Sequence, residues 1–163
     1  MSKKSKTISD NAFVKGFFRL NIKEDGKIVG DSGWIENQIT NYGYETCIVG
    51  PVGAIAGSTR VTALALGTGT TVASNSSALP GELSDASNCR ISALTPTAVT
   101  SKTLRFVGSL NSNIVTATRA IANIGMFATS STVNGSCIAG NTYTTSTLAT
   151  NQTVDATYEL RFA

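Results

Sequence analysis

Residues 60–83 read RVTALALGTGTTVASNSSALPGEL, and the interpretation of the whole chain starts from this stretch. Its first part places apolar or small side chains on both faces of a strand, which is typical of a central strand covered on both sides. The run GTGTT at 67–71 cannot continue that regular strand, because its glycines favour a sharp exit from the sheet. We interpret Gly67 and Gly69 as structural loop residues and expect at least one to hold a strained backbone conformation.

The composition around this stretch favours an all-β domain. Hydrophobic residues make up 41% of the 163 residues and charged residues only 14%, whereas about 25% charge is usual. Thr, Ser, Asn and Gly replace the missing charge, and they suit strands and tight turns better than long amphipathic helices. A surface this poor in charge gives a monomer little protection against association, so we expect part of it to be buried in an assembly.

Alternating apolar and polar side chains separated by turn residues predict an antiparallel β-sandwich or jelly roll. Asp25-Gly26 predicts a tight hairpin turn between the first two strands, and Thr95-Pro96-Thr97 is expected to break the strand predicted at 89–94. The predicted strands cover residues 12–23, 28–36, 61–66, 89–94, 103–110, 114–118, 120–128, 137–144 and 154–162.

One short helix is predicted at residues 41–49. Thr40 or Asn41 would cap its beginning, and Gly50-Pro51 would end it. The helix would place several apolar side chains of this segment on one stripe facing the core.

The first residues form a polar, basic N-terminal arm (residues 1–11), followed by a single β-sandwich domain (residues 12–163). The arm carries Lys3, Lys4 and Lys6 within a net charge of +3 for the whole chain. Such an arm can touch an acidic protein surface or nucleic acid, or it can simply be a solvated end. We expect a protein partner rather than nucleic acid. Residues 1–10 are too polar for a signal peptide, and no apolar run is long enough to span a membrane, so we expect folding in a cytoplasm.

The residues that carry most enzyme chemistry are missing or scattered. The chain has no histidine, and Cys47, Cys89 and Cys137 are odd in number and widely spaced. We expect three buried, unpaired thiols, no metal site and no cofactor. Glu82 and Asp85 are the closest pair of acids in a loop, but a solvated loop or a helix cap explains them better than a glycosidase pair. We therefore predict no catalytic residues.

Aromatic side chains offer a second kind of site. They could form a carbohydrate-binding platform, although at 7% of the chain most of them are needed in the core. The residues considered for such a platform are Trp34, Tyr42, Tyr44, Tyr143 and Tyr158.

Several segments, residues 135–140 among them, resemble structural proteins of tailed-bacteriophage virions. Residues 63–83, ALALGTGTTVASNSSALPGEL, resemble a strand ending in "AlGtGtt" followed by "aL..El" in those proteins. Residues 122–127, ANIGMF, resemble their "EiGlF" strand, with Asn123 where an acid is common. The closing YELRF at 158–162 and the segment GKIVGDSGWIENQITNYGYETCI at 26–48 are also similar.

This resemblance implies a β-rich, oligomeric protein without a cofactor. Our first expectation is a capsid decoration (cement) protein that bridges and stabilises subunits of the major capsid protein or other virion proteins. It would be assembled in the host cytoplasm and act as a homo-oligomer, with a trimer favoured. The alternative is a tail, collar or fibre protein, and an enzyme such as a cell-wall hydrolase is the third class.

Overall fold

The computed structural model describes all residues except 1–13, 54–55, 58, 86–88, 112–114 and 132–135. The predicted N-terminal arm with Lys3, Lys4 and Lys6 therefore lies outside the described residues. The predicted turn at Asn134-Gly135 lies outside them as well.

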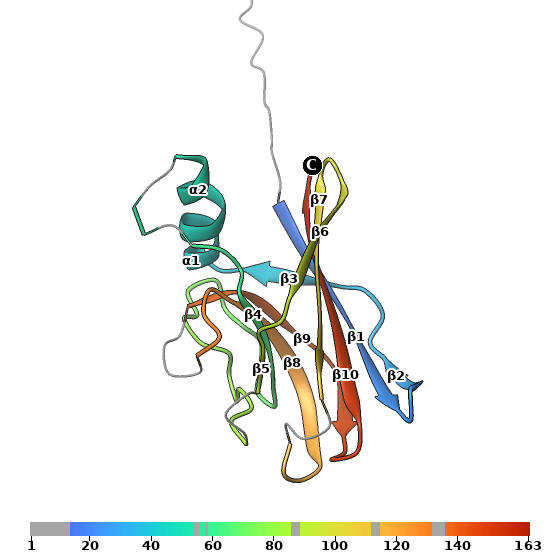
Figure 1. Cartoon of the computed structure of the whole chain (residues 1–163). Coiled ribbons are helices and arrows are strands. Elements are labelled where there is room, and N and C mark those ends of the chain that lie inside the picture. The colour runs from blue at the N-terminus through green and yellow to red at the C-terminus, as the bar shows by residue number, and fades with distance from the viewer. Residues whose placement is uncertain (1–13, 54–55, 58, 86–88, 112–114, 132–135) are drawn as a thin grey trace, which may run out of the picture.

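The all-β antiparallel class is confirmed, with one continuous ten-stranded sheet that curls on itself (Figure 1). Along the sheet the strand order is β5-β4-β8-β9-β3-β1-β10-β7-β6, and β2 pairs with β1 beside this path. The structure does not confirm the finer prediction of a sandwich or jelly roll. The strands are β1 (Val14–Glu24), β2 (Lys27–Asp31), β3 (Ile35–Ile39), β4 (Ala63–Gly67), β5 (Arg90–Ile91), β6 (Thr95–Thr100), β7 (Thr103–Leu110), β8 (Arg119–Phe127), β9 (Cys137–Leu148) and β10 (Thr153–Phe162).

The curl brings the two ends of the strand order together around one core. A Cβ atom on Gly108 of β7 would collide with the Ile91 side chain of β5 and lie 2.8 Å from Leu94 Cδ2. The same hydrophobic cluster contains Phe18 and Tyr158 from one half of the sheet and Ile124 from the other. The side chains of β10 alternate between the two faces of the sheet: Val154, Ala156, Tyr158 and Leu160 are buried on one face, although Phe162 at the end of that face is exposed.

The strand that carries the sequence argument is central, as predicted. Every residue of β4 is buried, and the strand lies between β5 and β8. Strand β8 is also buried on both faces from Ile124 to Phe127. The predicted hairpin joins β1 and β2, and its turn residues Asp25 and Gly26 both have positive φ, as a primed turn requires.

Some predicted strands have different bounds. The strand predicted at 28–36 is two strands, because Gly33 has a φ of 66° and interrupts it. Ser32 Oγ accepts a hydrogen bond from Leu20 N at 2.9 Å across this break. The strand predicted at 89–94 is shortened to β5, whereas the one predicted at 137–144 continues to the end of β9. Val115–Thr118 are not a strand, and residue 114 lies outside the description.

The strand predicted at 89–94 does not continue through Thr95-Pro96-Thr97, but these residues are not a break in structure either. These residues belong to β6, which pairs with β7 alone among the described strands and lies at the edge of the sheet. An edge strand tolerates proline, because the side of the backbone that faces away from its neighbour needs no N–H donor.

The helical segment is longer than predicted and consists of α1 (Asn41–Gly43), the π-helix η1 (Tyr44–Val49) and α2 (Gly50–Val52). Thr40 caps it as predicted, but Gly50-Pro51 does not end it. Pro51 has no N–H to donate to the Thr46 carbonyl, and that oxygen instead accepts from Thr59 N at 2.9 Å. An outside donor thus replaces the missing helical bond. None of the helices in the described part of the chain is long and apolar enough to cross a membrane.

Candidate binding groove

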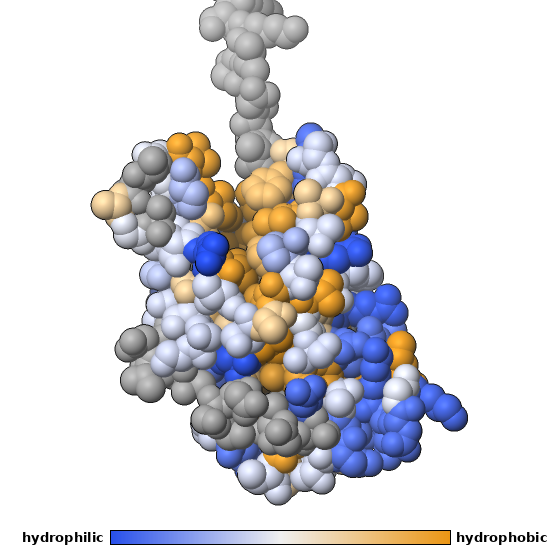
Figure 2. Space-filling view, viewed as in Figure 1, coloured by the Kyte–Doolittle hydropathy of each residue, from blue (hydrophilic) through white to orange (hydrophobic). Residues whose placement is uncertain are grey.

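A groove of about 520 Å³ lies where β1 begins, between β1, β3 and the helical segment. Its apolar walls come from Val14 on β1, Ile39 on β3, and Tyr44 and Ile48 on the helix. We call this hollow the end groove. Figure 2 shows a band of hydrophobic side chains that runs from beside the helical segment down the middle of this face of the molecule. Its volume is in the range of pockets that hold small molecules or side chains of a partner.

Thr40 and Gly43 fix the helical wall of the end groove against β9. The Thr40 hydroxyl is fully buried, donates to Cys137 O at 2.6 Å and accepts from Gly43 N at 3.0 Å. A Cβ atom on Gly43 would collide with the Ile138 carbonyl oxygen. A small residue is therefore required at this position, and the helix lies directly on the strand that pairs with β3.

A buried amide also lines the end groove. Asn37 and Gly16 are paired across β3 and β1, and the Asn37 side chain occupies the space that a Gly16 side chain would take. Asn37 Nδ2 donates to the hydroxyl of Tyr158, and burial raises the pKa of that hydroxyl, so it stays protonated. Asn37 Oδ1 is buried and has no hydrogen-bond partner among the described residues. This oxygen points into the space beside Gly16, so it is an internal unsatisfied acceptor and not a contact point for a partner.

The rim of the end groove carries balanced charge. Lys15 and Glu36 form an ion pair with 3.0 Å between Nζ and Oε1, and both side chains are more than half exposed. The exposed amide of Gln38 lies beside them. Four of the eight residues that line the end groove are polar or charged, so its surface is mixed, with the two charges at the rim paired to each other.

Several large apolar side chains near this end are exposed. Val52 of α2 is 90% exposed and Val49 of η1 is 57% exposed. Phe162, which pairs with Val14 at the start of β1, is also exposed. Scattered exposed apolar residues are ordinary, and a group of them near one groove makes this end a candidate interaction surface.

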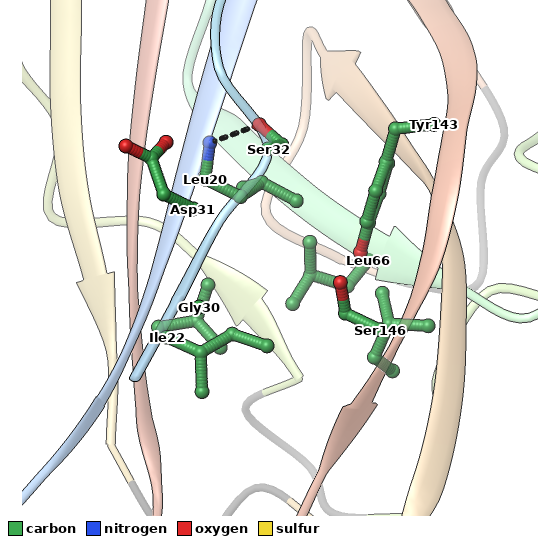
Figure 3. A pocket seen from close by; sticks show the side chains of 10 residues that line it. Leu20, Ile22, Gly30, Asp31, Ser32, Leu66, Tyr143 and Ser146 are labelled. Carbon is green, nitrogen blue, oxygen red and sulfur yellow. Dashed lines mark hydrogen bonds between the residues drawn. The ribbon is translucent and has the colours of Figure 1, made fainter. Parts of the chain in front are cut away.

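A smaller cavity lies inside the curl of the sheet. It has a volume of about 10 Å³, room for about one water molecule. Figure 3 shows Tyr143 and Ser146 of β9 pointing into it opposite Leu20 and Ile22 of β1. This cavity is a packing defect on the scale of one solvent molecule, and it is too small for a ligand.

Gly67 and Gly69 are structural residues, but the expected reason is wrong. Neither has a positive φ; the left-handed conformation occurs at Gly81, with a φ of 63°. A Cβ atom on Gly69 would collide with the Pro80 carbonyl oxygen, and one on Gly67 would lie 3.0 Å from both Pro80 O and Gly81 O. The close approach of two backbone segments, and not torsional strain, therefore requires glycine at both positions.

The two loop acids are held by arginines, which corrects the expectation of solvated or helix-capping carboxylates. Glu82 accepts from Arg90 at 2.6 and 2.9 Å, and Arg90 is almost fully buried with its guanidinium 3.7 Å from the Phe127 ring centroid. Asp85 accepts from Arg119 Nε at 2.9 Å. In the described part of the chain, no three acidic, cysteine or histidine side chains come together as a metal site.

The aromatic residues considered for carbohydrate binding do not form one platform. Tyr158 is fully buried, and Tyr143 packs edge-on against Phe18. Trp34 lies instead on the outer face of the sheet, 5.4 Å from the guanidinium of Arg161.

Sequence reasoning missed a cluster on that outer face. Glu159 alternates with the core residues of β10 and so lies on its outer face, yet it is buried, because Arg105 and Arg161 both donate hydrogen bonds to its carboxylate at 2.6 to 2.8 Å. Arg161 also lies 4.1 Å from the Phe17 ring centroid. The alternation of β10 shows which side chains share its outer face, but the pairing of β10 with β1 and β7 decides that these groups meet.

Comparisons with family models, curated proteins and solved structures found no match to this chain.

Proposed function

We propose that this chain is a non-enzymatic structural protein of a tailed-phage virion, in first place a capsid decoration protein that bridges neighbouring subunits. The end groove carries the proposal on the structural side. It combines apolar side chains with a charge-paired rim and lies near exposed valines, a combination suited to protein contacts. The resemblance of the sequence to virion proteins is the reason for proposing a virion as the assembly in which these contacts are made.

The arrangement of the acids supports a role without catalysis. The carboxylates of Glu82, Asp85 and Glu159 all accept hydrogen bonds from arginines. A general acid or base needs a proton that can be exchanged near the working pH. These carboxylates are held by arginines and serve to join strands and loops.

The test compares virions with and without this protein. If it is a decoration protein, virions lacking it should lose their DNA at lower temperature or lower salt, and adding back the purified protein should restore resistance. A chain without residues 1–10 should be retained less well, because the lysines of the arm would no longer contact the neighbour. Virions of normal stability that no longer adsorb to cells would contradict the decoration role and support the tail or fibre alternative.

A further inference from the structure

We propose that the outer face of β1, β10 and β7 binds an acidic segment of a partner protein, and that Arg105 and Arg161 hold one carboxylate of that segment. This inference names a second surface and the chemistry of its partner, and it rests on the proposed function only in placing the partner in a virion. We call Arg105, Glu159 and Arg161 the arginine cluster. Its surplus charge, its accessible donors and the aromatic side chains beside it carry the inference.

The arginine cluster contains one more cation than carboxylates. Glu159 Oε1 accepts hydrogen bonds from Arg105 Nε at 2.8 Å and Nη2 at 2.6 Å, and Glu159 Oε2 accepts from Arg161 Nε at 2.8 Å. Every other ion pair among the described residues joins one cation to one carboxylate. A second carboxylate, supplied by a partner, would therefore balance the charge of the cluster.

Both guanidinium groups keep donors for such a carboxylate. A guanidinium has five N–H groups, and within the described part of the chain the Nη1 groups of Arg105 and Arg161 have no hydrogen-bond partner. The two arginine side chains are 38% and 43% exposed, whereas the Glu159 side chain is only 4% exposed. The anion of the cluster is therefore covered, and its two cations remain accessible to a partner.

Aromatic rings hold Arg161 in place. Its Cζ atom lies 4.1 Å from the Phe17 ring centroid and 5.4 Å from the Trp34 ring centroid. A side chain that is already ordered by stacking and hydrogen bonds loses little further entropy when it binds a ligand. Trp34 is itself 40% exposed. Tryptophan and arginine are among the residues most enriched at the energetic centres of protein interfaces.

The basic N-terminal arm joins the fold beside the arginine cluster. Val14, the first described residue, pairs with Phe162, which directly follows Arg161. The three lysines of the arm precede Val14 in the sequence. The exposed turn with Lys102 lies here as well, because Lys102 O accepts a hydrogen bond from Phe162 N at 2.8 Å. The arm and the cluster thus carry the same sign of charge, which favours one acidic partner for both.

The charge pattern of the outer face favours a protein over a nucleic acid. This face also carries the carboxylates of Asp31, Glu36 and Asp155, each paired with a cation of its own. Duplex DNA presents one phosphate charge about every 1.7 Å along its axis, and these carboxylates would repel the phosphates beside a bound one. One surplus cation matches one carboxylate of a protein side chain.

The first test follows the arginine Nε–H signals and the Trp34 indole N–H signal of the full-length protein by NMR. The probe is N-acetyl-glutamic acid α-amide, and N-acetyl-glutamine amide is its uncharged control. The signals of Arg105, Arg161 and Trp34 should shift and saturate with the glutamic acid probe alone. Unchanged signals, or equal shifts with both probes, would overturn the inference. Shifts with oligothymidylate but not with the glutamic acid probe would overturn it in favour of a nucleic acid.

The second test measures binding of the full-length protein to virions that lack it. Arg161→Gln should weaken binding by about tenfold or more, because a charge-assisted contact is lost, while Arg105 still bonds Glu159 in this variant. Arg19→Gln is the matched control. It removes the same charge from the same outer face, where Arg19 pairs with Asp31 and is 39% exposed, and it should bind like the wild type. Melting temperatures of both variants show that they are folded.

The two tests separate this inference from the decoration role. Equal losses in the Arg161→Gln and Arg19→Gln variants would overturn the inference, because general charge and not the arginine cluster would then decide binding. Wild-type binding of the Arg161→Gln variant would also overturn it and would leave the decoration role intact. Probe shifts at the cluster of a protein that virions do not bind would support the inference and refute only the decoration role.

Discussion

Gly67 and Asn123 face each other directly across strands β4 and β8, and the Asn123 amide fills the space where a Gly67 side chain would be. Asn123 is completely buried, and its Nδ2 donates to Thr70 O at 3.0 Å and to Pro80 O at 2.9 Å. One amide thus joins the loop that leaves β4 to the loop that returns at Pro80. The sequence pattern at 67–71 and the strand at 122–127 are parts of one structural unit.

Gly67→Ala and Gly69→Ala should both destabilise the fold, by about 1–3 kcal/mol, the usual cost of overpacking. Gly69→Ala should cost more, since its Cβ would collide with the backbone of Pro80 and not only with a side chain. Gly30→Ala is the control, because its Cβ would make ordinary contact at 3.4 Å with Ile22. Urea unfolding measures all three, and equal stability of the Gly69→Ala variant and the control would contradict the close-approach explanation.

Asn123→Asp should lower the free energy of unfolding at neutral pH by at least about 2 kcal/mol. The carboxylate would lose two donated hydrogen bonds and would lie beside the carbonyl oxygens of Thr70 and Pro80 without a proton. Asn111→Asp, at an exposed position, should change stability little. Chemical denaturation of both variants is the measurement, and a neutral effect at Asn123 would mean that a nearby group can donate to the new carboxylate.

The free energy of unfolding should decrease with acidification over a pH range that is set by the pKa of Asp31. Hydrogen bonding from Arg19 is the main reason that the pKa of Asp31 falls from 3.8 to about 2. As the pH falls, the Asp31 carboxylate is therefore protonated in the unfolded chain at a higher pH than in the folded chain. The contribution of Asp31 to the free energy of unfolding is complete above its ordinary pKa of 3.8 and is lost as the pH falls toward 2. Interactions with arginines also lower the pKa values of Asp85 and Glu159, although burial opposes the shift.

The Asp31→Asn variant separates this contribution from the others. It should be less stable than the wild type at pH 7, and the difference in melting temperature should narrow as the pH is lowered toward 2. A difference that stays constant across the acid range would show that the Asp31 carboxylate gains nothing from Arg19 in the folded state.

The thiols should react with alkylating reagents in a fixed order in the native protein. Cys47 is partly exposed, whereas Cys89 and Cys137 are buried, and the described structure joins none of them by a disulfide. Burial is also the main reason that the pKa of Cys137 rises to about 12, so hardly any reactive thiolate exists at neutral pH. Mass spectrometry should show labelling of Cys47 first and of Cys137 only after unfolding; early labelling of Cys137 would contradict its burial.

Short-range features could be predicted from the sequence because neighbouring residues decide them. The Asp25-Gly26 turn requires positive φ at two adjacent residues, and the alternation of Val154 to Leu160 follows from the two-residue period of a strand. The Thr40 cap likewise needs only a hydroxyl near the first helical N–H groups.

Other features depend on partners far away in the chain. Pro96 is acceptable in β6 only because β6 lies at the edge of the sheet, and the helix passes Pro51 because Thr59 supplies the missing donor. The burial of Glu159 likewise requires Arg105, which lies on another strand.

The sequence by itself therefore determined the all-β class, the central position of β4 and the need for glycine at 67 and 69. The tertiary structure alone decided that close approach, and not backbone strain, imposes those glycines, and that Val14, Ile39, Tyr44 and Ile48 line one groove. The physical reason is the separation along the chain between the residues that decide each feature. Side-chain periodicity and turn geometry act over a few residues, whereas a groove exists only where strands and a helix distant in sequence leave a space between them.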